Sequence, residues 1–135
     1  MRRIIMSVAM LLLAQLGPGA SAQGLPQPQT QGGVTFITGG VAEDSQQAMR
    51  AVSGQYNLRL LFAQLRTGAY FAQVPVEIRD SAGATVLRTV SNGPFLYARL
   101  NSGRYTVVAS HNGVAQTRSA DVPAAGGVDL NFYWE

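Results

Sequence analysis

Residues 93–110 read GPFLYARLNSGRYTVVAS, and this stretch decides the fold. Phe95 and Tyr97 fall on one side of an alternating run, and Tyr105 begins a second run with the same two-residue period of a β-strand. Gly103 lies just before the second run, where it permits a φ angle that a side chain would oppose. The stretch therefore predicts two strands joined by a tight turn, with the Tyr105 ring in the core and its hydroxyl at the solvated rim.

The N-terminal segment has the pattern of a secretory signal peptide. A basic start at residues 1–3 precedes an apolar run at 4–16, and small residues follow at 20–22. We expect cleavage between Ala22 and Gln23, which leaves a periplasmic or secreted chain. A membrane anchor needs about 20 apolar residues, more than this run supplies, so we expect no membrane span after signal removal.

Composition excludes several classes of protein. Ten basic residues, two of them in the signal peptide, stand against seven acids, so the mature chain is close to neutral and is not expected to bind nucleic acid. The absence of cysteine excludes a disulfide framework, a thiolate metal site and a cysteine nucleophile. Stability must therefore come from packing.

The mature chain divides into a leader and one domain. Residues 23–33 are rich in Gln, Pro and Gly and predict a flexible leader, and residues 34–135 form the domain. Residues 43–52 predict the one convincing helix, with Asp44 as cap and Gln47 three positions later as in a capping box. An apolar stripe predicts that this helix packs on the core.

The rest of the domain reads as a series of strands separated by turn residues. We expect strands at 34–41, 57–64, 70–79, 85–90, 95–99, 104–110, 114–122 and 128–134. Asn112-Gly113 is a strong hairpin signal. A two-residue turn there pairs Tyr105 with Ala120 and Arg104 with Asp121, whereas a three-residue loop shifts the register by one. The two-residue turn is favoured because it opposes two charges.

A family resemblance appears at the same place. The motif consists of Gly93, Phe95, Tyr97, Leu100, Gly103, Tyr105 and Val107. It resembles the signature of the carboxypeptidase regulatory-like domains, which are transthyretin-like β-sandwiches, and the likeness covers residues 74–109. The resemblance implies a mainly β fold: an antiparallel, seven-stranded Greek-key β-sandwich, here with one short helix near the start of the domain. We interpret the motif residues as structural, filling the sandwich.

No catalytic constellation is evident. His111 is the single histidine and falls on a hairpin tip, which predicts a solvated turn residue because a metal site or a catalytic relay needs converging partners. Glu43 and Asp44 are adjacent carboxylates, and their place at a helix start accounts for them. We therefore expect no enzyme activity, no metal site and no cofactor. Solvent-facing arginines are expected on several strands, scattered rather than gathered into one patch: Arg59, Arg79, Arg99 and Arg104.

Two functions remain. The first is a non-catalytic periplasmic or secreted module that binds another protein or assists an envelope assembly. The alternative is a carbohydrate-binding module, because surface aromatic rings stack on sugars. The candidate aromatic residues are Tyr70, Tyr133 and Trp134.

Overall fold

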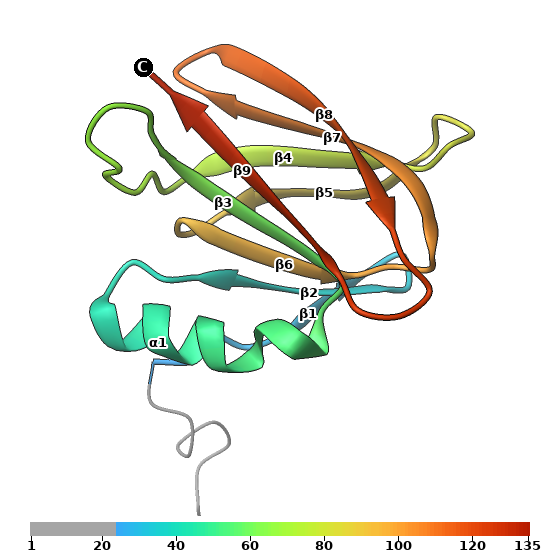
Figure 1. The fold of residues 1–135 in the computed structure, drawn as a ribbon, viewed down its shortest axis with the longest axis horizontal. Helices are drawn as coiled ribbons and strands as arrows, with labels where there is room; N and C mark the ends of the chain where they lie inside the picture. The colour runs from blue at the N-terminus through green and yellow to red at the C-terminus, as the bar shows by residue number, and fades with distance from the viewer. Residues whose placement is uncertain (1–23) are drawn as a thin grey trace, which may run out of the picture.

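The computed structural model describes residues 24–135, so the predicted signal peptide and its cleavage site lie outside the described residues. The described part is mainly β, with nine strands in two sheets and one short α-helix (Figure 1). The elements are β1 (Gln29–Gln31), β2 (Val34–Gly39), α1 (Glu43–Val52), a 3₁₀ turn η1 (Ser53–Gln55), β3 (Leu58–Gln64), β4 (Val74–Arg79), β5 (Thr85–Ser91), β6 (Phe95–Arg99), β7 (Gly103–His111), β8 (Val114–Val122) and β9 (Val128–Trp134). The expected count of seven strands is wrong. Within residues 24–135, no helix is long and apolar enough to cross a bilayer.

The strands form two sheets that share one core. Sheet A has the order β1-β2-β6-β3-β9 and sheet B the order β5-β4-β7-β8. Apolar side chains from both sheets meet in one cluster, which includes Phe62 and Phe132 of sheet A with Ile78 and Val107 of sheet B. Alternation produces this arrangement, because each second residue of a strand points to the same side.

The last strand corrects the expectation of purely antiparallel sheets. β9 pairs parallel with β3, from Leu58 opposite Val128 to Gln64 opposite Trp134. The chain enters β9 from the hairpin of β7 and β8 in the other sheet, so it returns along β3 in the same direction instead of reversing in a local turn.

The β7–β8 hairpin confirms the predicted register. Asn112 and Gly113 have positive φ angles of 48° and 77°, as a two-residue hairpin turn requires. Tyr105 lies opposite Ala120 and Arg104 opposite Asp121. The second pair forms an ion pair of 2.9 Å between Arg104 Nε and Asp121 Oδ1.

Part of the signature lies where we expected it. Tyr105 is buried and its hydroxyl donates to the Asn101 carbonyl at 2.8 Å. Leu100 and Val107 belong to the core between the sheets. Gly103 has φ +151°, in the region that favours glycine.

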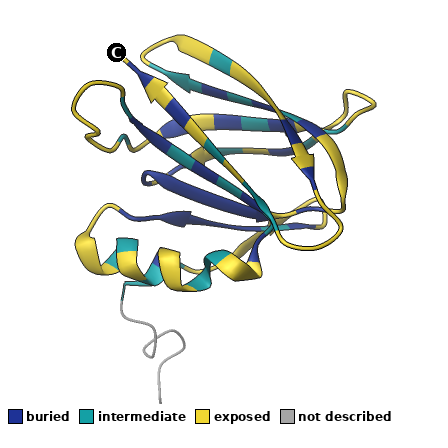
Figure 2. Ribbon diagram, in the orientation of Figure 1, coloured by how far each residue is buried: buried dark blue, intermediate teal, exposed yellow. Residues whose placement is uncertain are grey.

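Phe95 and Tyr97 do not fill the space between the sheets, and this corrects the expectation for these residues. They lie on the outer face of sheet A, in a second apolar cluster with Met49 of α1. Their neighbours Leu96 and Ala98 point into the main core instead. β6 is thus covered on both faces, and Figure 2 shows it buried along almost its whole length.

The helix has the predicted bounds but not the predicted cap. Its N-cap is Ala42, which makes no side-chain capping bond, and the Asp44 carboxylate accepts from the adjacent Ser45 amide at 2.9 Å. Met49 is the one helix residue that is fully buried. The helix is therefore held by packing on sheet A rather than by a capping box.

Two further segments, the expected leader and the start of β4, differ from expectation. The stretch expected as a flexible leader contains β1, which pairs antiparallel with β2, and Leu25 packs on the second cluster. Backbone pairing orders β1 although its side chains are exposed. The strand expected at 70–79 begins only at Val74, because Gln73 has a positive φ of 58° that ends the extended run.

Candidate functional site

Ala63 of β3 lies between two of the aromatic residues that the sequence singled out. It pairs with Tyr133 of β9 on one side and with Tyr70 on the other, where Tyr70 forms an isolated bridge beyond the end of β6. Residues opposite one another project to the same face of a sheet. Tyr70 and Tyr133 thus stand on the outer face of sheet A, and each is 41% exposed.

Two more exposed apolar side chains lie near these tyrosines. The Leu65 amide donates to the Trp134 carbonyl at 2.7 Å, which places Leu65 beside the end of β9. Trp134 Nε1 donates to the Val114 carbonyl at 2.9 Å, which places the tip of the β7–β8 hairpin there as well. Figure 1 shows the β3–β4 loop, this hairpin tip and the C-terminus at one end of the molecule. We call Leu65, Tyr70, Val114 and Tyr133 the apex patch.

Three aromatic rings, those of Phe71, His111 and Trp134, pack together next to the apex patch. The rings of Phe71 and His111 are stacked with centroids 3.8 Å apart, and Trp134 lies 5.7 Å from His111. The expectation that His111 is a solvated turn residue is therefore wrong, because its ring packs on a loop 40 positions earlier in the chain. Trp134 is 4% exposed, so the sequence-based expectation of a surface tryptophan is also wrong.

A groove runs along the outer face of sheet A beside α1. Its volume is about 350 Å³, and it is lined by Arg59, Leu60, Leu61, Phe95, Tyr97, Asp129 and Asn131. Aromatic rings follow one another along its α1 side at centroid distances of 5.7 to 6.1 Å, in the order Tyr70, Phe95, Tyr97 and Tyr56. The groove therefore combines ring faces with polar groups from β9.

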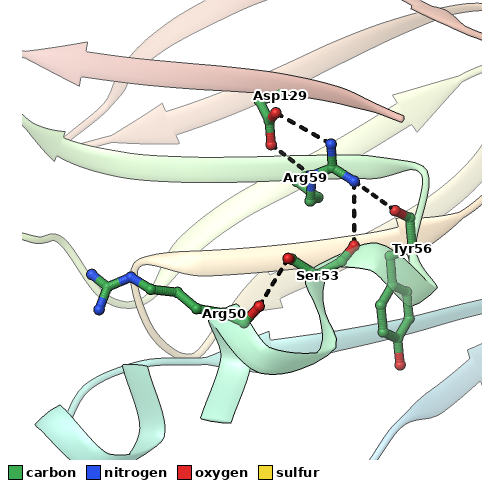
Figure 3. Close-up of polar contacts among 5 residues, drawn as sticks. All are labelled: Arg50, Ser53, Tyr56, Arg59 and Asp129. Carbon is green, nitrogen blue, oxygen red and sulfur yellow. Dashed lines mark hydrogen bonds and ion pairs between the residues drawn. The ribbon is translucent and has the colours of Figure 1, made fainter. Parts of the chain in front are cut away.

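Arg59 lines the groove and joins three elements, β3, β9 and the segment after α1 (Figure 3). Its Nε and Nη2 donate to the two oxygens of Asp129 at 2.6 and 3.2 Å. Its Nη1 donates to the carbonyls of Ser53 and Tyr56 at 3.2 and 2.9 Å. The hydrogen bond that Arg59 donates to Asp129 raises the pKa of Arg59. Because these bonds use most of its donors, Arg59 acts as a structural clamp.

Arg50 of α1 lies next to Phe95, which lines the groove, but is not itself among the lining residues. Its Nη2 donates to the Tyr70 hydroxyl at 3.3 Å, and its guanidinium lies 5.6 Å from the centre of the Phe95 ring. In Figure 3 its side chain points away from the Arg59 clamp. Within residues 24–135, Arg50 forms no ion pair with an acid. Sequence reasoning missed this residue, since a lone arginine on a helix gives no signal.

Tyr97 is one of the polar residues that line the groove. It is 4% exposed, and burial raises the pKa of its hydroxyl while the positive charges of Arg50 and Arg59 oppose that shift. No hydrogen bond to this hydroxyl is formed within the described part of the chain, yet its oxygen is not sealed inside the protein. The hydroxyl therefore opens to the groove.

The other arginines expected on the surface each have a partner of their own. Arg79 Nε and Arg88 Nη2 pair with Glu77 at 2.6 and 3.0 Å. Hydrogen bonds from Arg79 and Thr85, together with Arg88, lower the pKa of Glu77 to about 2. Arg99 donates to the Gln55 carbonyl at 3.0 Å. These side chains serve local pairs on different elements.

Side chains also bond to backbone groups of two edge strands, β9 and β5. On β9, the carbonyls of Tyr133 and Asn131 accept from Gln116 and Arg118 of β8 at 2.6 and 2.9 Å. On β5, the Arg88 amide donates to the Gln31 side chain of β1 at 2.8 Å. Free edge groups recruit further strands, and these three groups are already bonded.

Comparisons with known proteins add little. No family model matches the chain, and no curated protein matches it. A solved structure titled "Crystal Structure of S.CueP" aligns with a TM-score of 0.42 at 16% identity, over 54% of this chain and 59% of that chain. The chain thus spans less than two thirds of that structure's length, and a likeness at this TM-score carries no argument about fold or function. The resemblance of residues 74–109 to carboxypeptidase regulatory-like domains stays a prediction.

Proposed function

We propose that the chain is an exported, non-catalytic β-sandwich module of the transthyretin-like, Greek-key kind that binds a partner protein of the cell envelope through the apex patch. One observation carries this proposal: four of the six large apolar side chains that are exposed in residues 24–135 belong to that patch. Single exposed apolar residues are ordinary, whereas a group of neighbours is typical of a contact surface.

The remaining support is indirect. Residues 1–22 have the sequence pattern of an export signal. The single histidine, His111, is engaged in ring stacking with Phe71 rather than aimed at a nucleophile. Bonded backbone groups on β5 and β9 disfavour the addition of a partner strand at those edges.

Carbohydrate binding by surface aromatics is a second candidate, favoured by the row that Tyr70, Ala63 and Tyr133 form. Neighbouring strands lie about 4.8 Å apart, so the backbones of the two tyrosines stand about 10 Å apart, and both rings are partly exposed. Spaced aromatic rings on one face suit the faces of successive sugar units. Burial of Trp134 removes the third aromatic residue that the sequence proposed.

Site-specific photocrosslinking in the cells that export the protein tests the protein-binding proposal. A photoreactive amino acid is placed at Leu65 or at Tyr133, and at Val90 as a matched control, because Val90 is an exposed apolar residue on sheet B. We expect an adduct of one defined mass at both apex positions and none at Val90. The same adducts at all three positions, or none at the apex, would contradict the proposal.

A further inference from the structure

The groove contains a polar group that the fold itself does not use. Tyr97 is almost completely buried, and its hydroxyl has no hydrogen-bond partner among residues 24–135. Because no buried side-chain oxygen of the described residues is left without a partner, this hydroxyl is accessible to solvent, and water can bond to it. Tyr97 lines the groove. A ligand in the groove would replace that water as the hydrogen-bond partner of the hydroxyl.

The other lining residues indicate the chemistry of such a ligand. Asn131 and Asp129 of β9 line the same groove, and both are exposed. An amide offers donors and acceptors, a carboxylate offers acceptors, and a tyrosine hydroxyl offers both. Phe95 adds a ring surface. This mixture of hydrogen-bonding groups with ring faces suits a ring that carries several hydroxyl groups.

The charges around the groove are not balanced. Asp129 neutralises Arg59 through two hydrogen bonds. Arg50 has no acidic partner in the described part of the chain, and one hydrogen bond to Tyr70 leaves most of its donors free. A guanidinium with free donors binds a carboxylate through paired, charge-assisted hydrogen bonds. A ligand that extends from the groove past Phe95 to Arg50 would therefore match it best with an anionic group.

We propose that the groove binds a sugar acid, that is, a pyranose ring that bears a carboxylate. The Tyr97 hydroxyl and Asn131 bond the ring hydroxyls, and Arg50 binds the carboxylate. The groove volume of about 350 Å³ falls in the range of small-molecule sites. This site adjoins the protein contact proposed at the apex, because Arg50 donates to the hydroxyl of Tyr70, but the groove is lined by other residues. It shares with the carbohydrate candidate only the class of ligand and does not need the tyrosine row.

Nuclear magnetic resonance titration of the purified chain tests the inference. The probes are glucuronic acid and trigalacturonic acid, with glucose and cellotriose as their neutral counterparts. We expect chemical-shift changes centred on Tyr97 and Asn131 with the acids, and at least about tenfold weaker binding of the neutral sugars, because they leave Arg50 unpaired. If neither acid shifts these resonances, the inference is wrong.

Three variants separate this site from the rest of the molecule. Tyr97→Phe keeps the ring and should leave thermal stability unchanged or raise it, while the affinity for the acids falls about tenfold for the lost hydrogen bond. Arg50→Gln should remove the preference for acids over neutral sugars. Arg104→Gln, a matched change in an exposed pair on sheet B, should have no effect on binding. Unchanged acid binding by Tyr97→Phe would overturn the inference.

Tyr133→Ala distinguishes the groove from the tyrosine row. We expect this variant to bind the acids as the unchanged chain does, because Tyr133 is not among the residues that line the groove. Binding that is lost in Tyr133→Ala and kept in Tyr97→Phe would assign the sugar to the row and refute the groove. The photocrosslinking result at the apex is independent of all these outcomes.

Discussion

Arg59 and Asp129 are 70 positions apart in the sequence and form a two-point ion pair across β3 and β9, with Nε 2.6 Å from Oδ1. The same guanidinium holds the carbonyls that follow α1, at Ser53 and Tyr56. This side chain therefore ties the last strand of the chain to the first helix. The exposed fractions of the two partners differ, at 20% for the Arg59 side chain and 66% for that of Asp129.

This asymmetry predicts unequal costs for the two halves of the pair. Arg59→Ala should lower the free energy of unfolding by about 1–3 kcal/mol, because it removes the donor to Asp129 and to the Tyr56 carbonyl, while the Ser53 carbonyl keeps the Tyr56 amide. Asp129→Ala should cost less than about 1 kcal/mol, because an exposed ion pair contributes little and Arg59 keeps its carbonyl bonds. Urea unfolding of the two variants measures the difference. Equal losses would show that the carbonyl bonds contribute nothing.

We predict that the fold loses the stability that Glu77 contributes as the pH falls. Its pKa is lowered to about 2 from an ordinary value of 4.5, so the folded state holds this carboxylate charged where the unfolded state would protonate it. Stability from this group is complete above the unfolded pKa and is lost as the pH falls from about 4.5 toward 2. Glu77→Gln should lose less stability than the unchanged chain over that range. Thermal melts at several pH values compare the two, and parallel curves would contradict the assignment.

We predict that loss of the Tyr105 ring lowers the stability of the domain strongly and that loss of its hydroxyl lowers it only slightly. Tyr105→Ala should destabilise the domain by about 3–5 kcal/mol, as expected for a buried aromatic residue. Tyr105→Phe keeps the packing and loses only the bond to the Asn101 carbonyl, which should cost about 1 kcal/mol. Chemical denaturation of both variants provides the test. A stable Tyr105→Ala variant would refute the structural role of the motif.

We predict that a side chain at position 93, now Gly93, destabilises the fold. A β-carbon built at Gly93 would overlap the backbone of Gly39 on β2. Gly93→Ala should therefore cost about 1–3 kcal/mol as the strands shift apart. Gly54→Ala is the matched control, since no atom lies within 4 Å of a β-carbon there and no positive φ opposes it. That control should be neutral or stabilising by up to about 1 kcal/mol.

Local pattern was sufficient wherever the nearest neighbours in sequence decide the structure. The bounds of α1, β6, β8 and β9 match the expected ranges. Asn112 and Gly113 both have positive φ angles, as the two central residues of a two-residue turn do. His111 therefore pairs with Val114, and this pair sets the register of the whole hairpin. The same reasoning located Tyr105 in the core.

The candidate site was only partly predictable. Tyr70 and Tyr133 were selected as aromatic residues, but their common row depends on β9 and the β3–β4 loop both pairing with Ala63. Arg50 and Tyr97 were not selected as ligand contacts. Arg50 lies on α1 and Tyr97 on β6, so whether they are near one another depends on where α1 packs. Helical periodicity does not specify the face of the sheet on which a helix packs.

The sequence by itself thus determined most of the strands, the bounds of the helix and the β7–β8 hairpin, because a two-residue period and turn glycines act over a few residues. The tertiary structure alone decided what covers each face of β6. Alternation divides Phe95 and Tyr97 from Leu96 and Ala98, but it does not say which set meets the other sheet and which meets α1. That choice places the Tyr97 hydroxyl in the groove, and it follows from long-range packing between segments far apart in the chain.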